Sequence, residues 1–126
     1  MSHPSDLSYT DMHEWVRFDG SVVTVGITSY AAEALGDIIF VALPAAGSRL
    51  QANEPCGELE STKSVSELYA PVSGIVVEIN ASVVDDPSQI NSDPFGAAWL
   101  FRVSTETEIQ PLLLNAAEYS EFLKGA

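Results

Sequence analysis

The residue best suited to carry covalent chemistry in this sequence is a lysine. The chain has eighteen acidic and five basic residues, and only two of the basic ones are lysines, Lys63 and Lys124. Lys124 lies two residues from the C-terminus, so Lys63 is the only lysine in the body of the sequence. An enzyme that acylates one particular amine finds it most readily when that amine stands alone at an exposed turn. The scarcity of lysine therefore favours a carrier of a covalent group over a catalyst.

The sequence around Lys63 predicts a β-hairpin with this lysine at its tip. The segments 57–61 and 64–69 are two strand-like runs, nearly symmetric about Thr62-Lys63. A two-residue turn there would oppose the pairs Ser61/Ser64, Glu60/Val65, Leu59/Ser66, Glu58/Glu67 and Gly57/Leu68. Opposed residues share a face, so one face can pack on a core while the other forms an acidic collar. Neither Thr62 nor Lys63 favours positive φ, so we expect a turn other than type I′, or modest strain.

A lysine at a hairpin tip can also be an ordinary solvated charge, and its position alone favours that interpretation. The scarcity of lysine, the symmetric pattern and the acidic collar together favour a carrier site instead. None of these features identifies the acyl group that such a lysine would carry.

The remaining sequence predicts one compact, mostly β domain over residues 1–126. Apolar and β-branched runs predict further strands at 14–18, 21–27, 38–43, 75–79 and 99–103. The run 38–43 has no alternation of apolar and polar residues, so we expect a buried strand there. The segments 45–55 and 80–96 are expected to be loops, the second with room for a helical turn.

Turn and cap residues divide these elements. Asp19-Gly20 suits a type I′ turn in the first hairpin. Thr28 or Ser29 can cap a short helix over 30–35, which Gly36 would close. A C-terminal helix should begin at a capping box formed by Asn115 and Glu118, with Tyr119, Phe122 and Leu123 at helical spacing and Lys124-Gly125 at its end.

Composition restricts the partners and the location. The net charge of −13 repels nucleic acid and anionic membranes, so we expect neither as a partner. The acidic charge either favours docking onto basic protein surfaces or is a general solubility feature. No apolar run approaches the length of a membrane span, and residues 1–10 lack the pattern of a signal or transit peptide. We expect a cytoplasmic protein, or a matured one in the mitochondrial matrix.

The sequence offers little for catalysis. Cys56 follows Glu54-Pro55 with no basic neighbour, so we expect a small apolar residue rather than a nucleophile. With His3 and His13 as the only histidines, we expect no metal site, although His13 could contact a partner. No nucleophile–base pair, phosphate loop or metal cluster is visible, so an enzyme is the weakest functional class.

Residues 60–74 closely resemble the lipoyl-attachment motif of the glycine cleavage system H proteins. The resemblance covers residues 9–123 in order. It includes His13-Glu14-Trp15, Gly36-Asp37-Ile38, Phe40-Val41, Leu43-Pro44, Ile90-Asn91, Asp93-Pro94-Phe95-Gly96, Trp99 and Glu118-Tyr119. It implies a barrel-sandwich hybrid, like that of lipoyl domains, of two small antiparallel sheets with a short helix after the first hairpin and a C-terminal helix.

The same resemblance implies the function of a non-catalytic carrier, expected to be a monomer. Lipoate would be attached to Lys63 as N6-lipoyllysine by a lipoate ligase or a lipoyl/octanoyl transferase. The arm would carry an aminomethyl group from the pyridoxal-phosphate glycine decarboxylase, the P protein, to the tetrahydrofolate-dependent aminomethyltransferase, the T protein. Dihydrolipoamide dehydrogenase, the L protein, would reoxidise the dithiol.

The resemblance also implies roles for other residues. It makes Glu14 the candidate for holding the loaded arm in a cleft, the alternative being an ordinary surface glutamate. It assigns recognition by the lipoylating enzyme to Glu60, Glu67, Gly47 and Gly74. Both glycines could instead simply form turns.

Three other carriers or relays share parts of this pattern. A paralogue of the H protein that mainly relays lipoate to other proteins remains an alternative. A lipoyl domain of a 2-oxoacid dehydrogenase is usually one module of a longer chain, whereas the first and last motifs here match the H protein. A biotin carrier also presents a hairpin lysine, but flanks it with methionines where this chain has Thr62 and Ser64.

Overall fold

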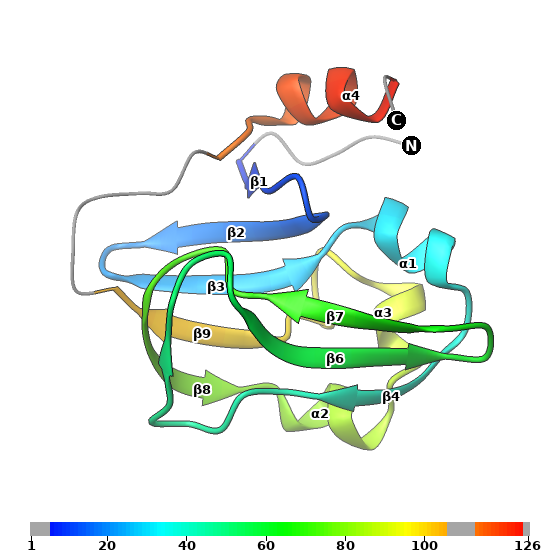
Figure 1. Ribbon diagram of the computed structural model, residues 1–126, viewed down its shortest axis with the longest axis horizontal. Helices are drawn as coiled ribbons and strands as arrows, with labels where there is room; N and C mark the ends of the chain where they lie inside the picture. The colour runs from blue at the N-terminus through cyan, green and yellow to red at the C-terminus, as the bar shows by residue number, and fades with distance from the viewer. Residues whose placement is uncertain (1–5, 106–112, 125–126) are drawn as a thin grey trace.

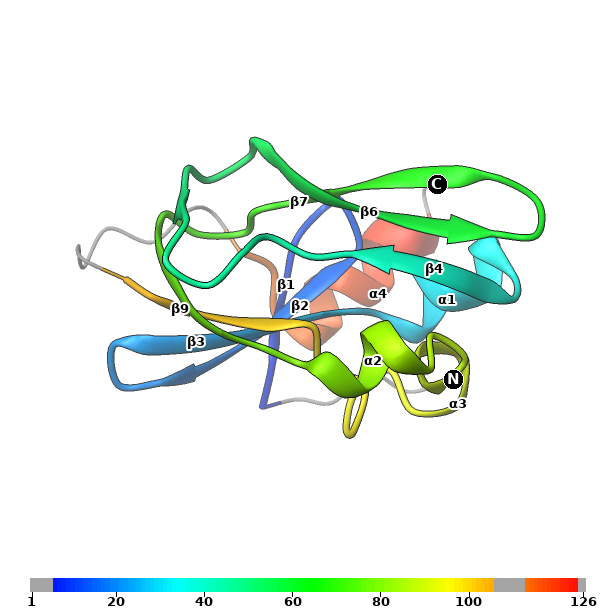
Figure 2. The same ribbon diagram turned by 90° about the horizontal axis from the view of Figure 1, so that it is seen from below.

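Two antiparallel sheets make up most of the protein (Figures 1 and 2). The computed structural model describes residues 6–105 and 113–124. The larger sheet contains, in spatial order, β1 (Ser8–Tyr9), β2 (Glu14–Asp19), β3 (Val22–Ile27), β9 (Phe101–Ser104), β8 (Gly74–Ile79) and β5 (Arg49–Leu50). The smaller sheet contains β4 (Ile38–Ala42), β6 (Pro55–Ser61) and β7 (Val65–Tyr69). The expected two-sheet, mostly β architecture is therefore confirmed.

The main core lies between these two sheets. Val25 and Val103 from the larger sheet are fully buried, and Leu59 and Leu68 from the smaller sheet are 3% and 1% exposed. Successive residues of a strand point to opposite faces, so the other face of the β6–β7 hairpin is turned away from this core. The sheet packing thus decides which hairpin residues are available to other molecules.

The first hairpin differs by one residue from the expected turn. Asp19 pairs with Val22, so the two loop residues are Gly20 and Ser21 rather than Asp19 and Gly20. Gly20 has φ 64° and Ser21 keeps a negative φ. Positive φ at the first loop position alone is typical of a type II′ turn. The expected type I′ turn is therefore wrong, because Asp19 is still part of the ladder.

The short helix after this hairpin forms as expected. Helix α1 spans Ser29–Leu35, and the hydroxyl of Thr28 accepts a hydrogen bond from the amide of Ala31 at its start. At its end Gly36 has φ 83° and its amide donates to the carbonyl of Ala32. The positive φ of Gly36 turns the chain directly into β4.

Strand β4 is not buried along its whole length, which corrects the expectation for residues 38–43. Ile38 and Val41 are each 3% exposed, but Ile39 and Phe40 are 54% and 51% exposed. A β-bulge explains this pattern, because Ile38 pairs with Ser61 and Phe40 already with the next residue of β6. The extra residue disrupts the alternation of faces, so two consecutive apolar side chains point outward.

The segment between β8 and β9 contains two short helices where a loop with room for a helical turn was expected. Helix α2 spans Ala81–Asp85 and α3 spans Gln89–Ser92. The side chain of Asn80 starts α2 by accepting from the amide of Ser82, and it also donates to the carbonyls of Ala97 and Trp99. The two-residue strands β1 and β5 were also not expected. No helix in the described ranges is long and apolar enough to cross a membrane.

The C-terminal helix α4 (Ala116–Lys124) packs on the outer side of β1 and β2 (Figure 1). Its expected capping box is confirmed by reciprocal hydrogen bonds between Asn115 and Glu118; Gly125 lies outside the described residues. The hydroxyl of Tyr119 lies 2.7 Å from Nδ1 of His13 and 2.8 Å from the hydroxyl of Thr28. The half-buried His13 ring therefore packs against α4 and helps to hold this helix on the body of the protein.

Candidate functional site: the hairpin that carries Lys63

The β6–β7 hairpin has the register expected from its sequence. Its pairs include Gly57 with Leu68, Glu58 with Glu67, Leu59 with Ser66 and Glu60 with Val65. The tip of the hairpin projects past α1 at one end of the molecule, and both views agree on this (Figures 1 and 2). The register puts Lys63 at this projecting tip.

A serine side chain shapes the turn at the tip. The Oγ of Ser61 accepts hydrogen bonds from the amides of Lys63 and Ser64, each at 3.1 Å. The backbone amide of Ser61 donates to the carbonyl of Ser64 at 2.8 Å. Thr62 and Lys63 both keep negative φ, so the tip is not a type I′ turn and shows no left-handed strain. Sequence reasoning missed this role of Ser61, although serine hydroxyls often cap turns in this way.

Contacts with the end of α1 hold the lysine in place. The amide of Thr62 donates to the carbonyl of Asp37 at 3.1 Å. The stem of Lys63 crosses Gly36, where an added Cβ would lie 3.4 Å from Cε of the lysine and 3.6 Å from Nζ. Lys63 is exposed, and its amine forms no ion pair with the residues that the structure describes. An amine of this kind is free to be acylated, so the site fits an amide-linked arm.

Carboxylates cover the outer face of the hairpin behind the tip. Glu60 pairs with Val65 close to the turn. Glu58 and Glu67 pair with each other two rows farther from the tip. Like charges placed opposite each other destabilise a sheet. In the described part of the chain none of the three is in an ion pair. The expected acidic collar is therefore present, and its charges are open to a basic partner.

Of the two glycines expected to help recognition, Gly74 is the first residue of β8 in the larger sheet, and Gly47 lies in the loop before β5. Gly47 has φ 92°, and its amide donates to the carbonyl of Val76 at 2.7 Å. A Cβ on Gly74 would lie 2.2 Å from the carbonyl oxygen of Ser104. The start of β8 lies at the end of the molecule away from the hairpin tip (Figure 1). The structure thus gives both glycines a role in the backbone and does not bring them to Lys63.

Glu14 lies at the base of the hairpin and is 2% exposed. One carboxylate oxygen accepts from the hydroxyl of Thr10 at 2.9 Å, and the other accepts from the amide of Tyr69 at 3.0 Å. Burial raises the pKa of Glu14 to about 7; the two hydrogen bonds oppose this rise, and Asp11 adds to it. Glu14 is therefore neither an ordinary surface glutamate nor a residue that lines an open cleft.

Cys56 lies near Glu14 and is half-buried against the main core. Burial, and secondarily the Glu14 carboxylate, raise the pKa of its thiol to about 12. The thiol therefore stays protonated at neutral pH and is a poor nucleophile. This agrees with the expectation of a small apolar residue.

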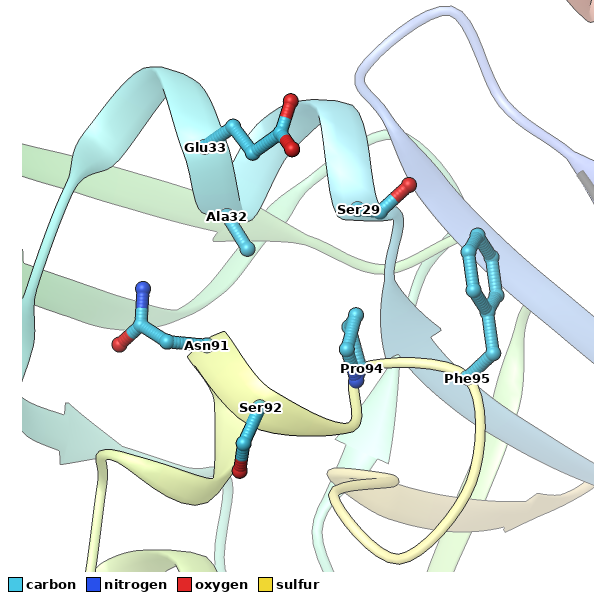
Figure 3. A pocket seen from close by; sticks show the side chains of 7 residues that line it. All are labelled: Ser29, Ala32, Glu33, Asn91, Ser92, Pro94 and Phe95. Carbon is cyan, nitrogen blue, oxygen red and sulfur yellow. The ribbon is translucent and has the colours of Figure 1, made fainter. Parts of the chain in front are cut away.

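A pocket of about 290 Å³ opens between α1 and the α3 region (Figure 3). It is lined by Ser29, Ala32, Glu33, Asn91, Ser92, Pro94 and Phe95. The buried hydroxyl of Ser29 has no hydrogen-bond partner in the described structure. The side-chain amide of Asn91 donates to the carbonyl of Gly36 at 2.8 Å, so one end of this pocket lies close to the stem of Lys63. The described residues contain no group of His, Cys, Asp and Glu that could hold a metal ion.

Comparison with known proteins gives a consistent result. A family model described as Glycine cleavage H-protein matches residues 7–126. The glycine cleavage system H protein of Beutenbergia cavernae is 58% identical over 125 residues, which cover 99% of each chain. That of Thermobifida fusca is 52% identical over 125 residues, covering 99% of this chain and 98% of the relative.

A solved structure extends the likeness to the fold. The crystal structure of a glycine cleavage system H protein from Mycobacterium marinum matches with a TM-score of 0.91 at 48% identity, covering 98% of this chain and 100% of that chain. The lipoyl-domain-like fold expected from the sequence is thereby confirmed. The chain belongs to the glycine cleavage H-protein family, the lipoyl carriers of the glycine cleavage system.

Proposed function

We propose that Lys63 carries lipoate as N6-lipoyllysine. The supporting observation is the exposed amine of Lys63, which stands without an ion pair among the described residues on a turn fixed by Ser61. The bond from Thr62 to Asp37 ties this turn to the end of α1. A fixed tip lets the attached arm search for partner sites while the protein body stays rigid, which raises the effective concentration of the arm at a docked partner.

In this proposal the protein is a carrier and not a catalyst. The lipoyl dithiolane accepts the aminomethyl group and electrons when it is bound, and the cofactors of the partners supply the remaining chemistry. The partners are the P, T and L proteins of the glycine cleavage system, together with a lipoate ligase or a lipoyl/octanoyl transferase. The site of these encounters is the cytoplasm.

Within the same proposal, Glu14 holds the aminomethyl ammonium of the loaded arm. A cation beside a carboxyl group favours its ionised form, so the approach of the ammonium would release the proton that burial holds on Glu14 near neutral pH. Each carboxylate oxygen keeps a lone pair beyond the bonds from Thr10 and Tyr69. The ammonium could use these positions after a small opening between the base of the hairpin and the loop that contains Thr10.

Loss of the bound one-carbon group to water tests the role of Glu14. We expect loaded Glu14→Gln protein to decay about tenfold faster than the loaded parent, since a partly desolvated charge pair is worth about 1–3 kcal/mol. Glu33→Gln is the matched control, because Glu33 is an exposed glutamate that lines the open pocket (Figure 3). Faster decay of the Glu33 variant and parent-like decay of the Glu14 variant would place the loaded arm in that pocket.

Recognition by the lipoylating enzyme is proposed for Glu60 and Glu67, which lie on the outer face behind Lys63. For Gly47 and Gly74 the proposal is indirect. The carbonyl of Ser104 occupies the place of a side chain at Gly74, so a substitution there would slow lipoylation by disturbing the fold.

Reconstitution of the whole cycle tests the proposed function. Lipoylated protein, mixed with the P, T and L proteins, tetrahydrofolate and NAD, should release CO2 from glycine in many turnovers per carrier. Lys63→Arg should abolish this release, because arginine keeps the charge but cannot be lipoylated. Lys124→Arg should retain full activity. Turnover supported by Lys63→Arg would disprove the assignment.

A further inference from the structure

The most exposed large apolar side chains in the described structure gather near Lys63. Val65, Ile39 and Phe40 are 57%, 54% and 51% exposed, more than any other large apolar residue in the described ranges. All three belong to the smaller sheet, at the end that carries the hairpin tip. Scattered exposed apolar residues are ordinary, whereas a cluster of them marks a surface that binds another molecule.

The register of the sheet makes these residues neighbours. Val65 pairs with Glu60 and Glu60 pairs with Phe40, so one cross-strand row joins the two apolar side chains across a carboxylate. Strands lie about 4.8 Å apart, so this row is about 10 Å long. Val65 is two residues from Lys63, at most about 7 Å along the chain. Ile39, Phe40 and Val65 therefore form one surface, the tip patch, immediately beside the lysine.

The outward position of two consecutive apolar residues follows from a specific backbone feature. Regular alternation would bury either Ile39 or Phe40. The bulge after Ile38 leaves both exposed, and the main core is formed without them. A β-bulge changes the direction in which side chains point. The exposure of Ile39 and Phe40 is therefore caused by the bulge in β4 and not by a lack of space in the core.

Charge around the tip patch limits what can bind there. Glu60 lies within the patch, and Glu58 and Glu67 lie farther down the same face. These carboxylates contribute to the net charge of −13 of the full sequence. The complementary surface is therefore apolar with basic groups at its centre and edge.

We infer that the tip patch is the docking surface for the enzyme that acylates Lys63, an inference that rests on the lipoyl attachment proposed above. That enzyme must bring the bare Nζ to its own activated acyl group, and the lysine stem is only four methylenes long. Its active-site rim must therefore cover the sheet surface within a few ångströms of the tip. Partners that act later meet the far end of a long arm and have no such need to cover the patch.

Lipoylation kinetics test this inference. The test variants are Phe40→Ser and Val65→Ser. The matched controls are Phe18→Ser and Val77→Ser. Phe18 and Val77 lie on strands of the larger sheet and are 40% and 49% exposed. Unmodified carrier is titrated against a lipoate ligase with lipoate and ATP, and product is measured by intact mass. We expect each tip-patch variant to raise the KM for the carrier about tenfold, because the side chain no longer makes an apolar contact with the ligase. Each control should raise this KM less than twofold.

Further readouts separate the possible outcomes. All four variants should keep the melting temperature of the parent, because the substituted side chains are exposed. Fully lipoylated tip-patch variants should be reduced and reoxidised by dihydrolipoamide dehydrogenase with the KM of the parent. Three results would each overturn the inference: an unchanged ligase KM in the tip-patch variants, an equal rise of this KM in the controls, or a rise only in the KM of the dehydrogenase. If the parent itself accepts no lipoyl group at Lys63, the proposed function fails instead.

Discussion

The two ends of the β6–β7 hairpin have opposite surroundings. At the tip, Lys63 and Val65 are exposed, and no described residue forms an ion pair with the amine. At the base, Leu68 is 1% exposed and the carboxylate of Glu14 is buried against the amide of Tyr69. The same two strands thus end in a surface made for other molecules and in a tightly packed joint with the rest of the protein.

This difference indicates a division of labour along one element. An amine that must enter another enzyme has to be presented without competing partners inside its own protein. The strands that present it need a rigid anchor, which burial of Leu59 and Leu68 between the sheets provides. Changes at the base should therefore affect stability first, and changes at the tip should affect modification first.

The largest effect is expected from truncation of a base residue. Leu68→Ala should lower the free energy of unfolding by about 2–5 kcal/mol, because it leaves a cavity in the main core. Val65→Ala, on the same strand, should change it by less than about 0.5 kcal/mol. Chemical denaturation of both variants checks the comparison. A loss at Val65 as large as that at Leu68 would mean that the tip is anchored as tightly as the base.

Next in size is a pH-dependent effect at Glu14. The pKa of Glu14 is about 7 in the folded protein against an ordinary value of 4.5, and burial is the main cause. Between these two values the folded state binds more protons than the unfolded state, so stability falls as the pH rises through this window. Glu14→Gln removes this titration. The stability of the variant relative to the parent should therefore rise by about 1–3 kcal/mol between pH 4.5 and pH 8.

Denaturation of both proteins at several pH values measures this difference. Glu33→Gln serves as the control, since Glu33 is exposed on α1. A relative stability of Glu14→Gln that is independent of pH would show that Glu14 has the same pKa in the folded and the unfolded state, which contradicts the raised pKa.

A smaller effect is expected at the turn itself. Ser61→Ala removes the acceptor of the amides of Lys63 and Ser64, which should lower the unfolding free energy by about 1 kcal/mol. Because the turn then loses its fixed shape, lipoylation of Lys63 should slow as well. Ser61→Thr keeps a hydroxyl and should restore both quantities. Slow lipoylation of the threonine variant would show that the size of the residue matters rather than its hydrogen bonds.

The smallest predicted effect has the opposite sign. Glu67→Gln relieves the repulsion with Glu58 across the hairpin, so it should raise the unfolding free energy by a few tenths of a kcal/mol. The same change should slow lipoylation, because a basic partner loses a contact. A variant that is more stable and modified at the parent rate would leave Glu67 without a recognition role.

The tip was predictable from sequence because local rules determine it. The symmetric pattern about Thr62-Lys63 gave the register of the hairpin, and the cap residues Thr28 and Gly36 gave the bounds of α1. The capping box of α4 followed from Asn115 and Glu118 in the same way. Each of these features depends on residues within a few positions of one another.

Two of the missed features are local, namely the turn at Gly20 and the cap by Ser61, whereas the others depend on contacts between distant segments. The apolar run of β4 indicated burial, but its bulge against β6 turns Ile39 and Phe40 outward, and no local signal in the sequence marks it. The sequence predicts an accessible Glu14, but its carboxylate is buried and accepts a hydrogen bond from the amide of Tyr69, which is 55 residues away in the sequence. The segment after Asn80 is expected to be a loop with room for one helical turn; the start of α2 is fixed in part by bonds from the Asn80 side chain to the distant carbonyls of Ala97 and Trp99.

The most direct test of this account locates the lipoyl group on the chain. After treatment with lipoate ligase, lipoate and ATP, intact mass should show one added lipoyl group on the parent and on Lys124→Arg, and none on Lys63→Arg. Acylation prevents tryptic cleavage after Lys63, so the digest should contain one lipoylated peptide that runs from Leu50 to Arg102. A lipoyl group found on Lys124, or a parent protein with no added mass, would contradict the assignment of Lys63 as the carrier residue.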